Sequence, residues 1–210
     1  MQKTPPKRTL SLYTLSSNVK ITENTVAIVL AAGKSERLGE PKALLNCGNQ
    51  TLIKFIVKRL ESIDLKVIVV TNSKLEKSIE ESLSSTKATL LIPENTDYRT
   101  GNLIAGLNIC KNPKQILVVP VDRPGWSLNT IKHLLEINET SCPVYEGKGG
   151  HPLLICKKDL DFLKKSPKDT PLNSIFSTKK INVNDPYIHL NIDTQEDIKF
   201  LKNFIDKFES

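Results

Sequence analysis

Four stretches within the first 121 residues of the chain are almost entirely apolar. They are rich in β-branched and aliphatic residues and cover residues 25–32, 66–71, 88–92 and 115–121. Strands that are covered on both faces in a parallel sheet have this continuous pattern, whereas half-exposed strands alternate apolar and polar positions. The pattern therefore predicts four central strands, the first of them TVAIVLAA.

Segments with helical periodicity separate these runs. Apolar positions recur at helical spacing in residues 52–60, 74–83, 102–110 and 126–137. Alternation of strand and helix predicts a parallel α/β sheet. We assign residues 25–210 to one domain and residues 1–24, which are rich in Pro, Ser, Thr and basic residues, to a flexible extension.

The second half of the chain is less regular. Residues 143–146 and 151–156 could pair as strands, and residues 188–192 could return to the sheet. A last helix is better marked, because Thr194 can cap it, Asp197 follows three residues later, and an apolar stripe continues through Ile198, Leu201, Ile205 and Phe208.

The loop after the first strand, LAAGKSERLGEPK at residues 30–42, is the segment most suited to phosphate binding. Ligands of parallel α/β proteins bind at the carboxyl ends of the strands, and Gly33 permits a close backbone approach. The loop is not a P-loop, since Ile28 stands where the first glycine belongs, and it lacks the GxGxxG spacing of dinucleotide-binding folds.

This loop closely resembles the signature loop of nucleotidyltransferases, in particular of the MobA-like molybdenum cofactor cytidylyltransferases, with Leu38 in place of the usual Met. The resemblance implies a Rossmann-like three-layer α/β/α nucleotidyltransferase fold (nucleotide-diphospho-sugar transferase, GT-A-like) with a mostly parallel mixed sheet. It also implies that Arg37 and Lys42 neutralise phosphates, with Lys34 a weaker candidate. The nucleotide-binding residues that it implies are Leu30, Ala31, Ala32, Gly33, Lys42, Asn72, Gly101 and Asn102.

Two aspartates are candidate ligands for Mg²⁺. Asp122 follows the fourth strand, and Mg²⁺ prefers oxygen ligands, of which one or two are carboxylates. Asp193 lies in NIDTQED, which resembles the closing Asp-Thr-Pro-Glu-Asp motif of the family, with Gln195 in place of Pro. The alternatives are a turn-forming role for Asp122 and a helix-capping role for Asp193.

Two further segments fit the resemblance. DYRTGNLIAGL at residues 97–107 resembles the glycine-led helix entry near the nucleotide, which would direct the N–H groups of Gly101 and Asn102 at the ligand. GKGGHPLLI at residues 147–155 resembles the Gly-His-Pro segment on the acceptor side, which makes His151 the candidate acceptor-binding residue. Arg123 departs from the Met or Gln that is usual after the aspartate. His133 and His189 belong to no motif.

Composition narrows the class of protein. The net charge of +7 is spread along the chain without a basic block, so we expect no nucleic-acid partner. No apolar run reaches the roughly 18 residues of a membrane span, and we expect a cytoplasmic protein without a membrane partner. The four cysteines show no CxxC spacing and predict packed thiols rather than a zinc site.

The activity implied by the resemblance is transfer of a nucleoside monophosphate, with CTP as the favoured donor, to a small phosphorylated acceptor such as the molybdopterin cofactor. Pyrophosphate leaves, and Mg²⁺ is the expected cofactor. The alternatives are transfer to a sugar phosphate or another alcohol phosphate, or an inactive nucleotide-binding protein of the same fold. A nucleic-acid-binding module that uses the basic extension is a further alternative. The sequence does not predict the oligomeric state.

Overall fold

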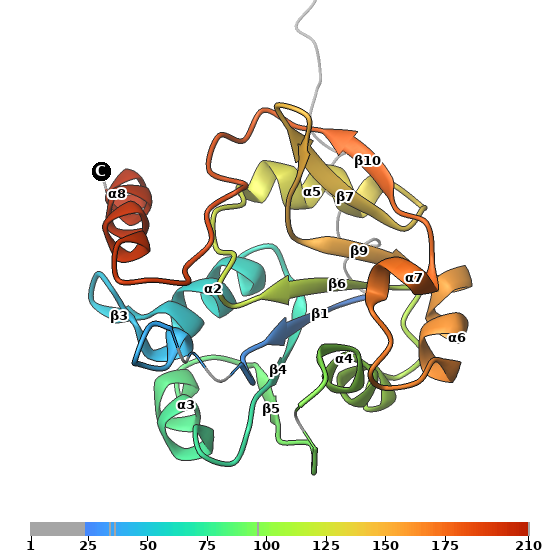
Figure 1. Ribbon diagram of the computed structural model, residues 1–210, viewed down its shortest axis with the longest axis horizontal. Coiled ribbons are helices and arrows are strands. Elements are labelled where there is room, and N and C mark those ends of the chain that lie inside the picture. Colours follow the sequence, from blue (N-terminus) through green and yellow to red (C-terminus); the bar gives the residue numbers. More distant parts are fainter. Residues whose placement is uncertain (1–23, 34, 36, 96, 210) are drawn as a thin grey trace, which may run out of the picture.

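The computed structural model describes residues 24–33, 35, 37–95 and 97–209. Of the proposed extension, only Asn24 lies among these residues, and Lys34 lies outside them. Within the described residues, the domain is built on an eight-stranded mixed sheet in the order β10-β7-β9-β6-β1-β4-β5, with β8 paired to β7 (Figure 1). The strands are β1 (Thr25–Leu30), β4 (Lys66–Val70), β5 (Thr89–Leu91), β6 (Gln115–Pro120), β7 (Ser141–Tyr145), β8 (Lys148–Gly149), β9 (Leu153–Cys156) and β10 (Lys179–Asn182).

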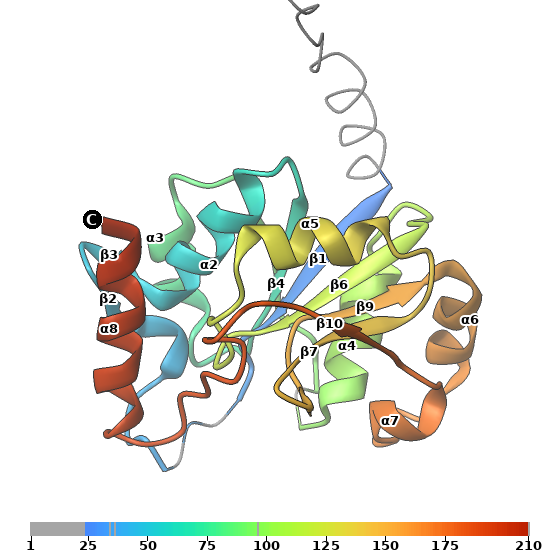
Figure 2. The same ribbon diagram turned by 90° about the horizontal axis from the view of Figure 1, so that it is seen from above.

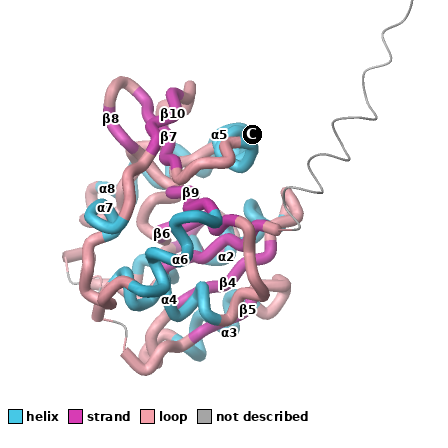
Figure 3. The backbone as a smooth tube through the Cα atoms, turned by 90° about the vertical axis from the view of Figure 1, so that its right-hand side faces the viewer, coloured by secondary structure: helices cyan, strands magenta, loops and turns pink. Residues whose placement is uncertain are grey.

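The four expected central strands are parallel neighbours. β1 pairs in parallel with both β4 and β6, and β4 pairs in parallel with β5. β9 is antiparallel to β6 and contacts β7 through the pair Ser141 and Leu154, so the two expected later strands do meet. Figure 3 shows β7, β8 and β10 gathered at one end of the molecule and β5 toward the other. The predicted mostly parallel mixed sheet is confirmed.

Helices cover both faces of the sheet and complete the three layers (Figure 2). A hydrophobic core lies on each face of the sheet, and alternate residues of β1 pack into the two cores. Ala27 and Val29 belong to one core, and Ile28 belongs to the other. The first face carries α2 (Leu52–Glu61), α3 (Glu76–Leu83), α5 (Leu128–Glu136) and, at its edge, α8 (Asp197–Glu209); the second carries α4 (Arg99–Asn108), α6 (Lys157–Lys165) and α7 (Leu172–Ile175). A short helix η1 (Lys42–Leu44) and a hairpin of β2 (Asn46–Cys47) and β3 (Gln50–Thr51) connect β1 to α2.

One strand prediction was wrong. Residues 188 and 189 lie in a turn and residues 190–192 are irregular, and the strand that joins the sheet late in the chain is β10. Ile188 and Ile192 are buried, which explains the strand-like pattern, but the N–H of Ile188 donates to Asp185 in a turn. The N–H of Ile192 donates to the carbonyl of Asp122 at 2.9 Å. This irregular segment therefore brings the chain before α8 to the end of β6.

The remaining expectations concern the cysteines, the histidines and the membrane. None of the four cysteines forms a disulfide. His133 is exposed on α5, and a ring nitrogen of His189 lies 3.0 Å from the carbonyl of Tyr145, so both fit surface or structural roles. Among the described residues, every helix is too short or too polar to cross a bilayer.

Candidate active site

Hydrogen bonds join the loop after β1 to the end of β4 and to the residues that follow it. The N–H of Ala31 donates to the carbonyl of Val70 at 2.8 Å, and the Thr71 hydroxyl donates to the carbonyl of Ala31 at 3.2 Å. The Asn72 amide donates to the carbonyl of Ala32 at 3.3 Å. Asn72 is not among the residues that line the adjacent cavity, so the structure places it as a support of the loop.

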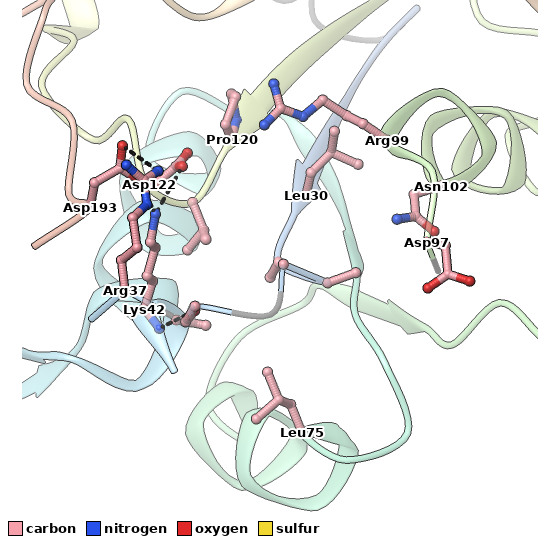
Figure 4. A pocket seen from close by; sticks show the side chains of 16 residues that line it. Leu30, Arg37, Lys42, Leu75, Asp97, Arg99, Asn102, Pro120, Asp122 and Asp193 are labelled. Atoms are coloured by element: carbon pink, nitrogen blue, oxygen red, sulfur yellow. Dashed lines mark hydrogen bonds and ion pairs between the residues drawn. The ribbon is translucent and has the colours of Figure 1, made fainter. Parts of the chain in front are cut away.

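A cavity of about 580 Å³ opens at the carboxyl edge of β1 and β6 (Figure 4). A side-chain carbon added at Gly33 would meet no other atom within 4 Å, so the backbone there is open to a ligand. The described residues that line the cavity are Leu30, Ala31, Ala32, Gly33, Ser35, Arg37, Lys42, Ala43, Leu75, Asp97, Arg99, Asn102, Pro120, Val121, Asp122 and Asp193.

Lys42 lies between the two aspartates that the sequence singled out. Its Nζ is 2.6 Å from Oδ1 of Asp193 and 3.3 Å from Oδ2 of Asp122. Arg37 contacts the other oxygen of Asp193 at 3.1 Å, although its own side chain is 74% exposed. The N–H of Lys42 also donates to the Ser35 hydroxyl at 3.2 Å. Residues from three distant parts of the chain thus form one group of alternating charge at the cavity wall.

The carboxylate of Asp193 is strongly stabilised in its ionised form. The hydrogen bond from Lys42 is the main cause that lowers the pKa of Asp193 to about 2, against a smaller opposing effect of burial, and the Asn191 amide at 2.7 Å adds to the lowering. Asp193 does not cap α8. Instead, the carboxylate of Asp197 accepts the N–H groups of Asp193 and Thr194, and it accepts the Thr194 hydroxyl at 2.9 Å. The helix-capping alternative for Asp193 is therefore wrong, whereas the predicted pairing of Thr194 with Asp197 at the start of the helix is present.

The two aspartates fit a divalent cation. Both direct an oxygen at a single ammonium group, which shows that one positive charge can be shared between them. Among the described residues, no cluster holds three or more His, Cys, Asp or Glu side chains in metal-binding arrangement. Two carboxylates suffice for Mg²⁺, because phosphate oxygens and water complete its coordination.

The helix entry near residue 100 differs from expectation. α4 begins at Arg99, the N–H of Gly101 donates to the carbonyl of Lys168 at 2.9 Å, and the N–H of Asn102 donates to Tyr98. Both N–H groups are thus taken by carbonyl groups of the protein, and Gly101 does not line the cavity, whereas Asn102 does. Sequence reasoning missed Asp97 and Arg99, which also line it; their place in the same motif was the available signal.

His151 is not among the described residues that line the cavity. Burial is the main cause that lowers the pKa of His151 to about 4; the positive charges of Arg123 and Arg99 lower it further, and Asp122 opposes them. The imidazole is therefore neutral near pH 7. The described residues provide no hydrogen-bond partner for its buried Nδ1.

The fold has three layers, and a glycine-bearing loop, two basic side chains and two aspartates surround a cavity at the carboxyl edge of its sheet. These features define the nucleotidyltransferase class. Residues 27–183 match the model of the MobA-like NTP transferase domain. The chain belongs to this family. A probable molybdenum cofactor guanylyltransferase of Bacillus mycoides is 31% identical over 114 residues, or 52% of this chain and 54% of the relative. The chain thus matches about half the length of that relative.

Solved structures agree on the fold. A nucleotidyl transferase from Methanothermobacter superposes with a TM-score of 0.74 at 21% identity, covering 88% of this chain and 98% of the other. Rv0371c of Mycobacterium tuberculosis, solved in complex with manganese, has a TM-score of 0.71 at 17% identity, with 86% and 98% covered. A 4-diphosphocytidyl-2C-methyl-D-erythritol synthase of Anaerococcus prevotii has a TM-score of 0.68 at 17% identity, with 89% and 99% covered.

Proposed function

We propose that this protein transfers a nucleoside monophosphate from a nucleoside triphosphate to a small phosphorylated acceptor and releases pyrophosphate, with Mg²⁺ as cofactor. The observation that carries the proposal is the charged group of Lys42, Asp122, Asp193 and Arg37 at the wall of a cavity that Gly33 also lines. The open backbone at Gly33 leaves room for the nucleotide. Nucleotidyl transfer needs this combination of phosphate-binding cations and cation-binding carboxylates.

For this reaction the protein has to position the two substrates and neutralise negative charge. An oxygen of the acceptor phosphate forms a bond to the α-phosphorus, and the bond from that phosphorus to the bridging oxygen of pyrophosphate breaks. A phosphate nucleophile is already ionised near neutral pH, so no general base is needed. Arg37 and Lys42 bind the leaving pyrophosphate and neutralise its growing negative charge.

Asp122 and Asp193 would hold the Mg²⁺. When bound, the ion supplies a Lewis acid that withdraws charge from phosphate oxygens. The low pKa of Asp193, about 2, keeps its carboxylate ionised and able to bind a cation throughout the physiological pH range. The ion would take the place of the Lys42 ammonium group between the two carboxylates, and Lys42 would then pair with phosphate oxygens of the nucleotide. The manganese complex of the M. tuberculosis relative supports a divalent cation in this fold.

The sequence motifs favour CTP as donor and a molybdopterin-type acceptor. The name of the Bacillus relative, a molybdenum cofactor guanylyltransferase, supports the same acceptor and makes GTP the second candidate donor. The test is pyrophosphate release from each of the four ribonucleoside triphosphates with Mg²⁺, with and without molybdopterin that carries molybdenum. We expect acceptor-dependent release from CTP or GTP. Pyrophosphate release only with a sugar phosphate would show that the acceptor is a sugar phosphate and not molybdopterin. Nucleotide binding without any pyrophosphate release would contradict the proposed activity.

A further inference from the structure

A side chain that the proposed reaction does not use joins the loop after β1 to the segment that carries Asp193. The amide of Gln195 donates to the carbonyl of Leu38 at 2.9 Å, and the same nitrogen lies 3.4 Å from a carboxylate oxygen of Glu40. The side chain of Leu38 is 3% exposed and packs in the core, which anchors this residue but does not direct its carbonyl group. The hydrogen bond from Gln195 fixes that direction, and it connects two positions that are 157 residues apart along the chain.

The turn that Gln195 contacts has a backbone conformation that needs support from outside. Ser35 has a positive φ of 52°, in the left-handed region that favours glycine, and Gly39 has a φ of 80°. The N–H groups of Leu38 and Gly39 both donate to the carbonyl of Ser35 at 3.2 Å, which closes the turn. Arg37 lies within this turn, so the position of the turn decides where the Arg37 side chain leaves the backbone.

Among the residues that the structure describes, the other polar contacts between this loop and residues 188–197 are ion pairs. Arg37 contacts Asp193 at 3.1 Å, and Nζ of Lys42 contacts it at 2.6 Å. In the proposed reaction both basic side chains bind phosphates and Asp193 binds the cation, so both ion pairs are broken. The amide of Gln195 carries no charge and takes no part in this exchange. Its hydrogen bond to Leu38 is therefore the polar contact that remains between the two segments when the substrates are bound.

We propose that Gln195 is a positioning residue, which holds the loop after β1 against the Asp193 segment while a nucleotide and a cation replace the ion pairs between them. The proposal rests on the proposed function and deepens it, because it assigns the alignment of Arg37 with the triphosphate to an uncharged side chain. Proline, the usual residue at this place in the family motif, has no side-chain donor, so the contact is a feature of this chain. It serves the nucleotide and not the acceptor, since Arg37 and Lys42 bind the leaving pyrophosphate.

Hydrogen exchange in the nucleotide-free protein tests the contact without turnover. In about 1 M NaCl, which screens exposed ion pairs, we expect the N–H groups of Leu38 and Gly39 to exchange about fivefold faster in Gln195→Met than in wild type, because the turn loses a hydrogen bond. Gln195→Lys should exchange like wild type, since its ammonium group can donate to the same carbonyl. Glu196→Gln changes the exposed neighbouring residue and serves as control. Equal exchange in wild type and Gln195→Met, or no recovery in Gln195→Lys, would overturn the proposal.

Steady-state kinetics test whether the contact serves the nucleotide. We expect Gln195→Met to raise the KM for the nucleoside triphosphate about fivefold, with kcat and the KM for the acceptor within about twofold of wild type. A variant that is merely less stable has a smaller active fraction, which lowers kcat and leaves both KM values unchanged. A fall in kcat alone, or a rise in the acceptor KM alone, would overturn the positioning role. If wild type transfers no nucleotide while exchange in the loop still depends on Gln195, the proposed function fails and the hydrogen bond still holds the loop.

Discussion

At the scale of single residues, the site is organised around Lys42. Its ammonium group contacts both aspartates in the ligand-free protein, at 2.6 and 3.3 Å, and so holds together the ends of two distant segments. The same ammonium group is expected to compete with a divalent cation for these carboxylates. Lys42 therefore has two roles in our account: it is a counter-ion before the nucleotide binds and a phosphate ligand afterwards.

This dual role predicts opposite effects of Lys42→Ala on two ligands. Without the ammonium group, the aspartates should bind Mn²⁺ about tenfold more tightly in the nucleotide-free protein, because no cation of the protein competes. The KM for the nucleoside triphosphate should rise about tenfold or more, because a charge-assisted hydrogen bond to phosphate is lost. Electron paramagnetic resonance measures the free Mn²⁺, and the exposed Lys74→Ala serves as control. Weaker Mn²⁺ binding by Lys42→Ala would contradict the competition.

The buried histidine predicts a dependence of stability on pH. His151 has a folded pKa of about 4, below its ordinary value of 6.5, because of burial, Arg123 and Arg99, with Asp122 opposing. Between these two values the unfolded chain binds more protons than the folded one, so the free energy of unfolding decreases as the pH falls from 6.5 to 4. The contribution is on the order of 3 kcal/mol at most.

Urea unfolding at pH 7 and at pH 4.5 measures this contribution. We expect His151→Gln to lose less stability than wild type between the two pH values, because glutamine cannot take up the proton. His133→Gln, which changes an exposed histidine on α5, should behave like wild type. Equal losses in wild type and His151→Gln would show that the folded pKa of His151 is not lowered.

At the scale of elements, two packed contacts hold the segments that carry the aspartates. The guanidinium group of Arg59 on α2 donates to the carbonyl of Pro124 at 3.0 Å and to that of Trp126, and it lies 3.9 Å from the centroid of the Trp126 ring. Burial is the main cause that lowers the pKa of Arg59 to about 10, so the side chain remains charged at neutral pH. It thereby fixes the turn that follows Asp122.

Removing this guanidinium group should destabilise the protein. We expect Arg59→Leu to lower the free energy of unfolding by about 3 kcal/mol, because two buried carbonyl groups lose their donor and the stacking on Trp126 is lost. Chemical denaturation measures the loss. Lys58→Leu, at the neighbouring exposed position of the same helix, should change stability by less than about 0.5 kcal/mol. A similar loss in both variants would contradict the role given to Arg59.

The second contact joins the turn after β6 to the irregular segment before α8. A side-chain carbon added at Gly125 would lie 1.8 Å from the carbonyl oxygen of Tyr187, a distance that no repacking of side chains relieves. We expect Gly125→Ala to cost about 3 kcal/mol of stability and to weaken Mn²⁺ binding, because the two segments that carry Asp122 and Asp193 are pushed apart. Gly149→Ala is the matched control, since its added carbon would meet only the Cys142 sulfur at 3.9 Å. Equal stability of the two variants would contradict this contact.

At the scale of the whole molecule, the sequence predicts the centre of the sheet better than its edge. β1, β4 and β6 are buried on both faces, so their sequences are continuous apolar runs with few other interpretations. β10 buries only Ile181 of its four residues, which is too weak a pattern to predict a strand. The irregular segment at residues 188–192 resembles a strand in sequence because Ile188 and Ile192 are buried, and an apolar pattern reports burial and not hydrogen bonding.

The candidate site, too, could be predicted from the sequence only in part. The carboxyl ends of parallel strands meet at one edge, which is why Asp122 and the loop through Lys42 could be placed together from the sequence, with the family motif adding Arg37 and Asp193. The direction of single groups could not be predicted, because it depends on tertiary contacts. The N–H of Gly101 is taken by the carbonyl of Lys168, and the Asn72 amide supports the loop.

Transfer of a radiolabelled α-phosphate from CTP or GTP to the molybdopterin acceptor tests nucleotidyl transfer at this site most directly, because it follows the bond that forms. Asp122→Asn is the matched variant, since it keeps the size of the side chain and removes the charge that would bind Mg²⁺. We predict Mg²⁺-dependent labelling of the acceptor with equal release of pyrophosphate, reduced about a thousandfold or more in Asp122→Asn. Labelling at the wild-type rate by Asp122→Asn, or no labelling of any phosphorylated acceptor from any of the four nucleotides, would contradict the account.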